Sequence, residues 1–358
     1  YSEAMELADK VCQQLSEEVI GRDPSVEEVQ DMVERVLVEQ GHAKTAKAYI
    51  LYRADRTRAR EMNSTLMKIY EDLTFMSASD CDIKRENANI DGDTAMGTML
   101  KYGSEGAKQF NEMYVLDPKH SQAHINGDIH IHDLDFLTLT TTCCQIDLLK
   151  LFHGGFSTGH GYLREPNDIS SYAALACIAI QSNQNDQHGG QSVPIFDYAM
   201  AEGVKKTFRR LYTTNLAKAV SFTLGIEDYT EVLEEFKLIA GDIAKEYGLY
   251  PSLQNNDEYK AKEWETAKYG DEFSHLQDRA EKLAESETDR ATYQAMEALI
   301  HNLNTMNSRA GAQNPFSSIN YGTDTSPEGR MVIKNVMLAE EHGLGNGETP
   351  IFPIHIFK

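Results

Sequence analysis

The sequence predicts an α/β protein preceded by a small helical unit, and three observations support this prediction. Apolar residues over positions 1–60 have the spacing of helices throughout. From about residue 82, turn residues lead into short β-branched and apolar runs, which are typical of strands. Long amphipathic stretches separate these runs, and strands that alternate with long helices indicate an α/β barrel or a layered sheet.

The N-terminal helices have recognisable starts and stops. Asp23-Pro24-Ser25 precedes a helical run, with Ser25 as the expected N-cap and Glu28 as its capping-box partner three residues on. Gly41 is expected to end that helix, and another begins over residues 44–61. We expect this helical piece to be separate from the rest of the chain.

The later elements are predicted in order along the chain. Residues 137–146 are dense in Thr and Leu and indicate a buried strand, and residues 170–181 are apolar enough for a buried helix. Residues 226–306 have the helical spacing of two or three long amphipathic helices. Residues 314–322 indicate a loop that feeds a short strand, and residues 351–357 another strand.

The composition is that of a folded protein, and the charge limits the kinds of partner that the protein is expected to bind. The 358 residues suggest about two domains, at roughly 150 residues each, or one large one. Hydrophobic residues make up 41%, so a sizeable core can form. The net charge of −22 repels a phosphate backbone, which argues against nucleic-acid binding. The longest purely apolar stretch, residues 172–180, is about half a membrane span, so no membrane association is expected.

Five cysteines are too few and too scattered for a disulfide framework, and no signal-peptide pattern opens the chain. They are Cys12, Cys81, Cys143, Cys144 and Cys177. We therefore expect a reducing, cytoplasmic location. The first residue is Tyr, and the last residues form an apolar run that stops without a turn, so both ends are expected to be truncated.

A histidine-rich segment, residues 126–135, is the densest chemical cluster. On an extended chain, His130 and His132 would share one face, which is a familiar arrangement of metal ligands. The same side chains could instead cap backbone groups at a strand entrance. No later ligand set stands out, so we predict no metal site in this chain.

The adjacent cysteines Cys143 and Cys144 are the second cluster. Neighbours on a strand point to opposite faces, so only one of them can face a central cavity, and a disulfide between them would be strained. A cysteine in a buried strand is more often a small hydrophobe than a catalytic group. The residues themselves leave both interpretations open.

Glycine-rich and amide-rich pieces could approach a ligand or could simply be turns. One lies at residues 153–161, another at residues 188–192, and neither matches a known phosphate-binding fingerprint. Residues 307–316 combine Arg309 with small polar residues, which suits an anion or a base edge and equally suits a packed surface loop.

Taken in order, these segments resemble the large catalytic chain of the anaerobic, class III ribonucleoside-triphosphate reductases, which are glycyl-radical enzymes. The resemblance covers about residues 80–358 and rests on NGDIHIHDLD (126–135), CCQIDL (143–148), HGGFSTGHGYLREPNDI (153–169), NQNDQHGGQSVPIFDYAMAEG (183–203) and NSRAGAQNPFSSINYGTDTS (307–326). Residues 1–55 resemble the second half of an ATP-cone, without the β-hairpin that holds nucleotide phosphates. Residues 56–358 would then be the first portion of the catalytic domain.

The resemblance implies a ten-stranded α/β barrel with one active-site cysteine on its first strand. Cys143, four residues before Asp147, is placed there, with Cys144 as the alternative. In the family, a glycyl radical generates a thiyl radical on a second cysteine, which abstracts the ribose 3′-hydrogen. The first-strand cysteine then donates to the substrate as the 2′-hydroxyl leaves. The product would be a 2′-deoxyribonucleoside triphosphate, and the reductant, formate or a redox protein, is left open.

The resemblance also implies cofactors and partners. A specificity effector, ATP or a deoxynucleotide, would bind at a dimer interface, and the loops between effector and substrate would contain His188, Gly189, Gly190, Gln191, Arg309 and Gln313. A radical-SAM iron-sulfur activase, a homodimer and ribonucleoside triphosphates are the expected partners. The second cysteine, the radical glycine and a four-cysteine zinc site are missing from this sequence, so we expect the chain alone to be inactive.

Two other hypotheses stay open at this point. One is a metal-dependent barrel hydrolase that uses His130 and His132. The other is a nucleotide-binding regulatory module in which the cone remnant and the glycine-rich loops bind effectors.

Overall fold

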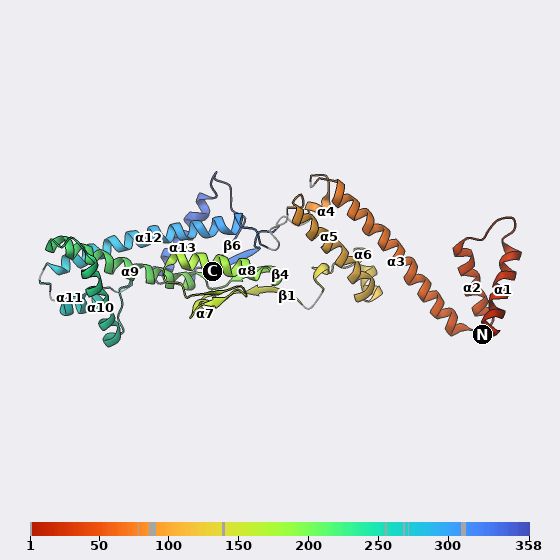
Figure 1. Ribbon diagram of the computed structural model, residues 1–358, viewed down its shortest axis with the longest axis horizontal. Helices are drawn as coiled ribbons and strands as arrows, with labels where there is room; N and C mark the ends of the chain where they lie inside the picture. Colours follow the sequence, from red (N-terminus) through yellow and green to blue (C-terminus); the bar gives the residue numbers. More distant parts are fainter. Residues whose placement is uncertain are drawn as a thin grey trace. The chain divides into compact units, whose positions relative to one another are not determined.

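The computed structural model describes residues 2–77, 79–85, 91–137, 140–254, 256–267, 269–270, 272–308 and 313–358. The chain divides into two compact units. Unit 1 consists of Tyr1–Cys81 and Leu100–Asp135, and unit 2 of Asp82–Met99 and Phe136–Lys358. The bar in Figure 1 relates colour to residue number and so identifies the segments of each unit.

Unit 1 is helical, as the sequence predicts for its N-terminal part. Its described elements are α1 (Ser2–Glu18), α2 (Val26–Glu39), α3 (Ala43–Phe75), most of α5 (Ala95–Phe110), the π-helical turn η1 (Asn111–Val115), α6 (Pro118–Ile125) and the start of the 3₁₀ turn η2 (Leu134–Phe136). Val11, Met32 and Val36 form the small core between α1 and α2. The helix expected from residue 44 begins at Ala43 and runs on to Phe75.

The predicted capping box at the start of α2 is confirmed. The Ser25 hydroxyl accepts from the Glu28 backbone N–H at 3.2 Å, and the Glu28 carboxylate accepts from the Ser25 N–H at 2.8 Å. Two of the helix's unsatisfied N-terminal donors are thereby paired. The helix ends at Glu39, and Gly41 follows with φ +83°, a conformation that glycine adopts without strain.

Long-range hydrogen bonds join α3 to the second segment of unit 1. The Arg58 guanidinium donates to the Ser121 hydroxyl at 2.5 Å, and the Tyr70 hydroxyl donates to the Tyr102 carbonyl at 2.9 Å. The buried Asn111 amide donates to the Leu134 carbonyl at 2.7 Å. Hydrogen bonds between residues far apart in the sequence therefore hold unit 1 together, in addition to the packing of helices that are neighbours along the chain.

Unit 2 contains a four-stranded parallel sheet in the order β1-β4-β5-β6, which confirms the α/β class. The strands are β1 (Thr141–Gln145), β4 (Gln187–Val193), β5 (Ser317–Tyr321) and β6 (Ile354–Phe357), and a separate antiparallel hairpin consists of β2 (Phe156–Ser157) and β3 (Tyr162–Leu163). The described residues form four parallel strands, and they do not show the ten-stranded barrel that the resemblance implies.

The buried strand predicted over residues 137–146 is wrong in two respects. The strand covers only Thr141–Gln145, while residues 138 and 139 lie outside the described residues. Four of its five residues are exposed, because β1 lies at the edge of the described sheet and pairs there with β4 alone. Apolar density predicted a strand here, but burial depends on neighbours that lie far away in the sequence.

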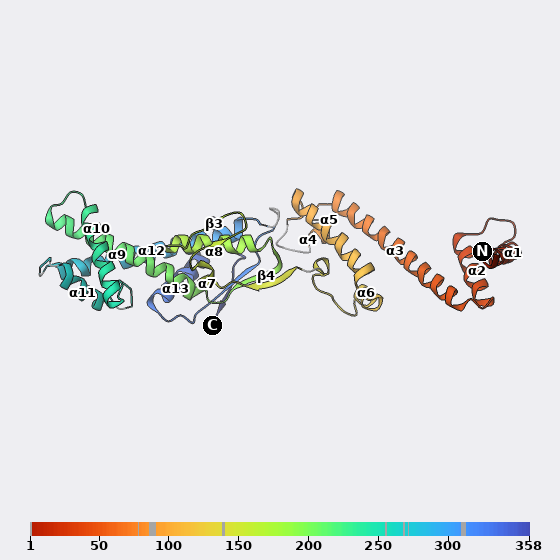
Figure 2. The same ribbon diagram turned by 60° about the horizontal axis from the view of Figure 1, so that its bottom comes forward.

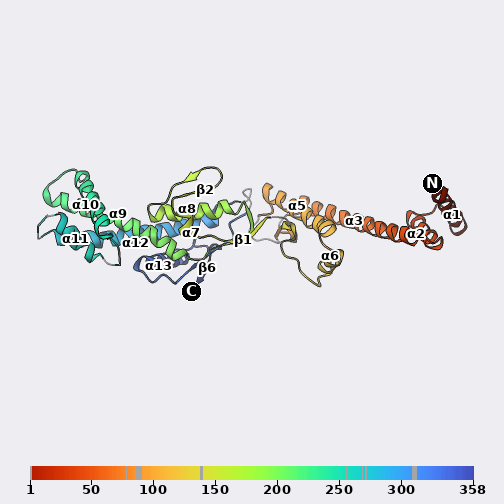
Figure 3. The same cartoon turned by 90° about the horizontal axis from the view of Figure 1, so that it is seen from below.

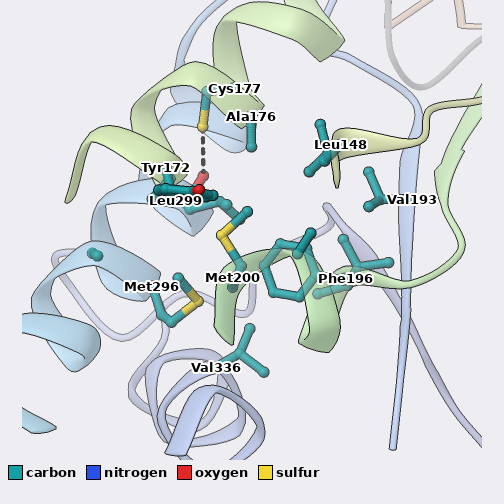
Figure 4. Close-up of a cluster of buried hydrophobic side chains, with 14 of the residues drawn as sticks. Leu148, Tyr172, Ala176, Cys177, Val193, Phe196, Met200, Met296, Leu299 and Val336 are labelled. Atoms are coloured by element: carbon teal, nitrogen blue, oxygen red, sulfur yellow. Dashed lines mark hydrogen bonds between the residues drawn. The ribbon is translucent and has the colours of Figure 1, made fainter. Parts of the chain in front are cut away.

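Four helices pack on the sheet and bury the main core of unit 2. They are α8 (Ile169–Asn183), α9 (Phe196–Leu224), α12 (Phe273–Thr305) and α13 (Pro327–His342), and the short helices α4 (Asp82–Arg85) and α7 (Leu148–Phe152) belong to the same unit. The predicted buried helix at residues 170–181 is confirmed as α8. Figure 4 shows Val193 from β4 close to Phe196 and Met200 from α9. The Cys177 thiol also lies in this core, near the Leu299 carbonyl at 3.8 Å.

The predicted amphipathic helices of residues 226–306 are confirmed as three elements. They are α10 (Thr230–Tyr247), α11 (Asp257–Ala267) and α12, whose bounds are given above. Figures 2 and 3 show α10 and α11 gathered beside α9. Their apolar faces meet in a second core that includes Phe208, Leu216, Phe236 and Phe273. No helix in the described part of the chain is both long and apolar enough to cross a membrane.

A buried carboxylate connects the start of α9 to the loop after β5. Asp197 is fully buried, and its Oδ2 accepts from the backbone N–H groups of Gly322, Thr323 and Asp324 at 2.8, 3.0 and 2.9 Å. Three backbone donors that would otherwise lack partners are satisfied by one side chain. This arrangement fixes α9 relative to the sheet that carries the cysteines.

Candidate active site

Cys143 occupies an irregularity in the pairing of β1 with β4. Thr142 is opposite His188 and Cys144 is opposite Gln191, so Cys143 alone faces the two glycines between them. Its φ of +29° is in the range that side chains other than glycine rarely adopt. The bulge presents the Cys143 side chain at an exposed position on the sheet edge.

Gly189 leaves room for the Cys143 thiol. A Cβ atom added to Gly189 would lie 2.6 Å from Cys143 Sγ, closer than two such atoms can approach. Gly189 also has φ +82°, a conformation that strains any L side chain. The sequence therefore needs glycine here for two independent reasons, and both concern the conformation around Cys143.

Cys144 lies on the helix-covered side of the strand, where its sulfur has an amide partner. Val193 and Ile319 point into the helix-covered core, and Gln191 lies two residues before Val193, so it shares that face. Cys144 is opposite Gln191 in the ladder. Asn183 Nδ2, at the end of α8, donates to Cys144 Sγ at 2.9 Å. The two adjacent thiols therefore occupy different environments.

The residues His188 to Gln191, which we expect in a loop, lie within strand β4 instead. The loop prediction is wrong because the paired glycines form part of a bulge inside the ladder. His188 is buried, its ring stacks on Phe136 with 4.7 Å between centroids, and its Nδ1 lies 3.2 Å from Thr140 Oγ1. His188 thus contacts the residues on the approach to β1.

The second predicted loop is only partly described. Arg309 lies outside the described residues. Ser308 and Gln313 close the segment between them through two backbone hydrogen bonds of 2.9 and 3.2 Å. Gln313 is buried, and the Ser308 hydroxyl donates to Gln184, the residue directly after α8. The base of this loop is therefore anchored next to Asn183.

The histidine-rich segment does not form a strand. Residues 129–133 have no regular secondary structure, and none of the described strands pairs with them. The short 3₁₀ turn η2 follows directly. The rings of His130 and His132 are 5.9 Å apart, and His124 accepts from the Ile131 N–H at 3.2 Å. Over the described ranges, no group of three or more His, Cys, Asp or Glu residues is arranged to hold a metal ion. These histidines therefore offer no support for the hydrolase hypothesis.

The glycine-rich segment at residues 153–161 is a turn into the β2–β3 hairpin. A Cβ on Gly155 would lie 2.3 Å from the Leu163 carbonyl oxygen, and φ is +89° at this position. Gly154 donates its backbone N–H to the Glu165 carboxylate at 3.0 Å. Local packing explains these glycines without a ligand.

A basic pocket between α9 and α10 was not predicted from the sequence. The cavity measures about 520 Å³, and its lining includes Lys206, Arg209, Arg210 and Lys237. Lys206 pairs with Glu165 at 2.7 Å. The sequence signal was the basic spacing of residues 205–210, which brings cations to one helix face.

Arg209 is the most enclosed cation of this pocket. Its guanidinium stacks on the Tyr250 ring at 4.2 Å, and burial lowers its pKa below the usual value. Among the described residues, its buried Nε finds no hydrogen-bond acceptor. A partly desolvated cation at a pocket wall attracts an anion more strongly than one in open water.

Comparison with known proteins gives a consistent result. Residues 86–358 match the family model of anaerobic ribonucleoside-triphosphate reductase, and residues 1–58 match that of the ATP cone domain. The anaerobic ribonucleoside-triphosphate reductase of Escherichia coli (strain K12) is 26% identical over 347 residues, which cover 96% of this chain and 40% of that protein. The enzyme of the same name from Enterobacteria phage T4 is 26% identical over 282 residues, 76% of this chain and 36% of that protein.

A solved structure is also similar. The anaerobic ribonucleotide reductase from Thermotoga maritima, in complex with dATP and CTP, matches with a TM-score of 0.40 and 13% identity, over 79% of this chain and 40% of that one. The chain spans about 40% of the length of the two curated relatives. Since one family model alone covers residues 86–358, the chain belongs to the family of anaerobic ribonucleoside-triphosphate reductases.

Proposed function

We propose that this chain is part of an enzyme that reduces ribonucleoside 5′-triphosphates to 2′-deoxyribonucleoside triphosphates under anaerobic conditions. The observation that carries the proposal is the exposed Cys143 thiol on β1, opposite the bulge that Gly189 and Gly190 form in β4. Family membership supplies the reaction class, and the bulge supplies a thiol that a ribose can reach. We further propose residues 1–55 as an ATP-cone remnant and residues 56–358 as part of a ten-stranded barrel.

In this proposal Cys143 is the hydrogen donor of the substrate-reduction step. A glycyl radical outside this sequence supplies hydrogen-atom abstraction from the ribose 3′-carbon, through a thiyl radical on a second cysteine. Cys143 donates a hydrogen to the substrate as the 2′-hydroxyl leaves as water. An external two-electron reductant, formate or a redox protein, supplies the electrons and restores the thiol, and the second cysteine returns the 3′-hydrogen. Positioning the thiol against the sugar is what this chain contributes, since correct placement is worth several kcal/mol of barrier.

His188 on the adjacent strand β4 and Phe136 in the turn before β1 support this placement. Their stacked rings and the contact from His188 to Thr140 order the chain that leads into β1. A sulfur on a flexible strand would sample many positions, whereas a strand held by side-chain contacts with its neighbour samples fewer. We assign these residues to positioning and not to proton transfer.

The test uses the complete protein, activated anaerobically with a radical-SAM activase. Cys143→Ser is expected to abolish deoxynucleotide formation while the glycyl radical doublet in electron paramagnetic resonance is retained. Cys144→Ser is the matched control and should leave product formation measurable. Turnover in the Cys143→Ser enzyme with none in the Cys144→Ser enzyme would transfer the donor role to Cys144.

We also propose that the basic pocket binds the triphosphate of an effector nucleotide. Four cations line the pocket beside one carboxylate, Glu165, in a protein whose net charge is −22, so the pocket is a local exception to a repulsive field. Arg209→Ala should weaken deoxynucleotide binding by about tenfold or more, since charge-assisted bonds contribute roughly 1.5–3 kcal/mol each. Lys245→Ala on α10, outside the pocket lining, is the control in titration calorimetry. Equal affinities of the two variants would contradict the assignment.

The remaining parts of the proposal concern partners and cofactors. We propose a homodimer and an activase as protein partners, a cytoplasmic location, and a four-cysteine zinc site outside this sequence. Dimer formation is checked by sedimentation of the complete protein, and zinc by metal analysis of the same sample.

A further inference from the structure

Two neighbouring thiols with the same chemistry lie at the proposed site, and only one of them is exposed. The difference originates at Asn183, the last residue of α8. Its Nδ2 donates both to Cys144 Sγ at 2.9 Å and to Gln191 Oε1 at 2.8 Å. One amide therefore joins the helix end, strand β4 and strand β1.

The orientation of that amide is set by its neighbours. Gln191 is 3% exposed, and its Nε2 donates to the Ile180 carbonyl at 3.0 Å. A carbonyl only accepts, so the NH₂ group of Gln191 must face Ile180 and its Oε1 must face Asn183. Asn183 then has to present its own NH₂ group in that direction. The Cys144 sulfur consequently faces a hydrogen-bond donor.

The contact has a consequence for the accessibility of the two thiols. Asn183 holds the Cys144 sulfur on the helix-covered side of the sheet. Cys143 is exposed where the pairing of β1 with β4 is irregular, and its sulfur lies against Gly189. Loss of the Asn183 contact would free the side-chain rotamer of Cys144, so that this thiol would also become accessible.

We propose that Asn183, oriented by Gln191, is a positioning residue that selects which thiol is presented, holding Cys144 against α8 so that Cys143 alone faces the substrate side. The role assigned to Cys143 rests on the proposed function. The selection between the thiols does not, and it is measurable without turnover.

The experiment is competitive alkylation of the purified protein with iodoacetamide, followed by peptide mass spectrometry of each cysteine. In the wild type, Cys143 should react about tenfold faster than Cys144, since accessible thiols react preferentially. The buried Cys81 and Cys177 report on global integrity and should stay slow in every variant that remains folded.

The decisive variant is Asn183→Ala, which removes both the N–H donor and the atoms that lie against the Cys144 sulfur. We expect the rate ratio of the two thiols to fall to within about threefold, because the released Cys144 thiol becomes accessible. Asn183→Asp keeps the shape of the side chain and should keep Cys144 slow, because a neighbouring carboxylate disfavours the thiolate. Asn185→Ala, two residues further on, changes an amide that donates to the Gln181 carbonyl and should leave the ratio unchanged.

A wild-type ratio retained in Asn183→Ala would overturn the proposal, because Asn183 would then not hold the Cys144 sulfur. Equal rates of the two thiols in the wild type would overturn it as well. In the activated complete enzyme, Asn183→Ala should lower kcat by about tenfold with KM for the ribonucleotide unchanged. Absence of product in the activated wild type would count against the proposed function alone, because the alkylation ratio is independent of it.

Discussion

Single residues decide the geometry of the proposed site. Cys143 and Gly189 both adopt positive φ where β1 and β4 lose their regular register. Strained backbone of this kind persists only where surrounding structure holds it, and it is common at functional sites. The bulge is thus a local feature with an energetic cost of about 1–3 kcal/mol for each strained residue.

Gly189→Ala should lower the free energy of unfolding by about 1–3 kcal/mol, since its φ is unfavourable for a side chain. The added Cβ would also displace Cys143 Sγ, so turnover of the complete enzyme should fall more than stability alone explains. Urea unfolding and activity of the same preparations check both effects. Gly161→Ala, whose Cβ would meet no described atom within 4 Å, is the control and should change neither.

Glu263 is a buried carboxyl in the second core of unit 2. It accepts from Tyr212 at 2.7 Å, Tyr259 at 3.2 Å and Gln277 at 2.8 Å. Burial raises its pKa to about 6, and these three hydrogen bonds offset only part of that shift. The carboxyl therefore titrates close to neutral pH.

The stability contribution of Glu263 should decrease as pH rises. Its folded pKa exceeds the ordinary value of 4.5, so the contribution is complete below about pH 4.5 and is lost as pH passes 6. Between pH 4 and 7, the wild type should lose about 2 kcal/mol relative to Glu263→Gln. Urea unfolding across this range measures the difference. The exposed Glu265→Gln serves as control, and parallel profiles of the wild type and Glu263→Gln would contradict the assignment.

At the scale of elements, helix termini determine where the chain can carry functional side chains. Asp168 caps α8, and its carboxylate accepts from the Ser171 backbone N–H at 2.8 Å. Burial alone would raise the pKa of Asp168, but the hydrogen bonds from Ser171, together with the charges of Arg210 and Arg164, more than offset burial and lower the pKa. The opposite end of the same helix carries Asn183. The cap fixes where α8 begins, and this helps to fix the position of the Asn183 amide at its other end, which contacts Cys144.

The capping box of α2 should be measurable in the same way. Ser25→Ala removes the hydroxyl that accepts from the Glu28 N–H, and it should cost about 1 kcal/mol of stability. Ser16→Ala removes a hydroxyl that bonds back to the Cys12 carbonyl within α1 and should be close to neutral. Thermal unfolding followed by circular dichroism compares the two. Equal destabilisation would mean that the cap contributes nothing specific.

For the whole molecule, two compact units with separate cores predict two unfolding transitions. In calorimetry, Ser25→Ala should lower the midpoint of the unit 1 transition by about 2–8 °C and leave the unit 2 transition in place. Glu263→Gln should change the midpoint of the unit 2 transition alone at pH 7. A single transition that moves in both variants would show that the units unfold as one.

The sequence predicted those features that depend on neighbours along the chain. Ser25 and Glu28 are three residues apart, so their capping box follows from sequence, and α8 follows from a continuous apolar run. The barrel prediction came from family resemblance, and the described residues show only its α/β class. His188 to Gln191 were expected in a loop because paired glycines usually mark turns, whereas here they occupy a bulge within β4.

The sequence by itself determined the family, the order of helices and strands, and the presence of two adjacent cysteines on one strand. Tertiary structure alone decided which thiol is exposed, because Asn183 and Gln191 lie 39 or more residues from Cys144 and meet it only in the folded sheet. It also decided the basic pocket, since Lys237 joins Lys206 and Arg209 only when α10 packs on α9. Periodicity records which face of an element is apolar, but the partners of that face are set by long-range packing.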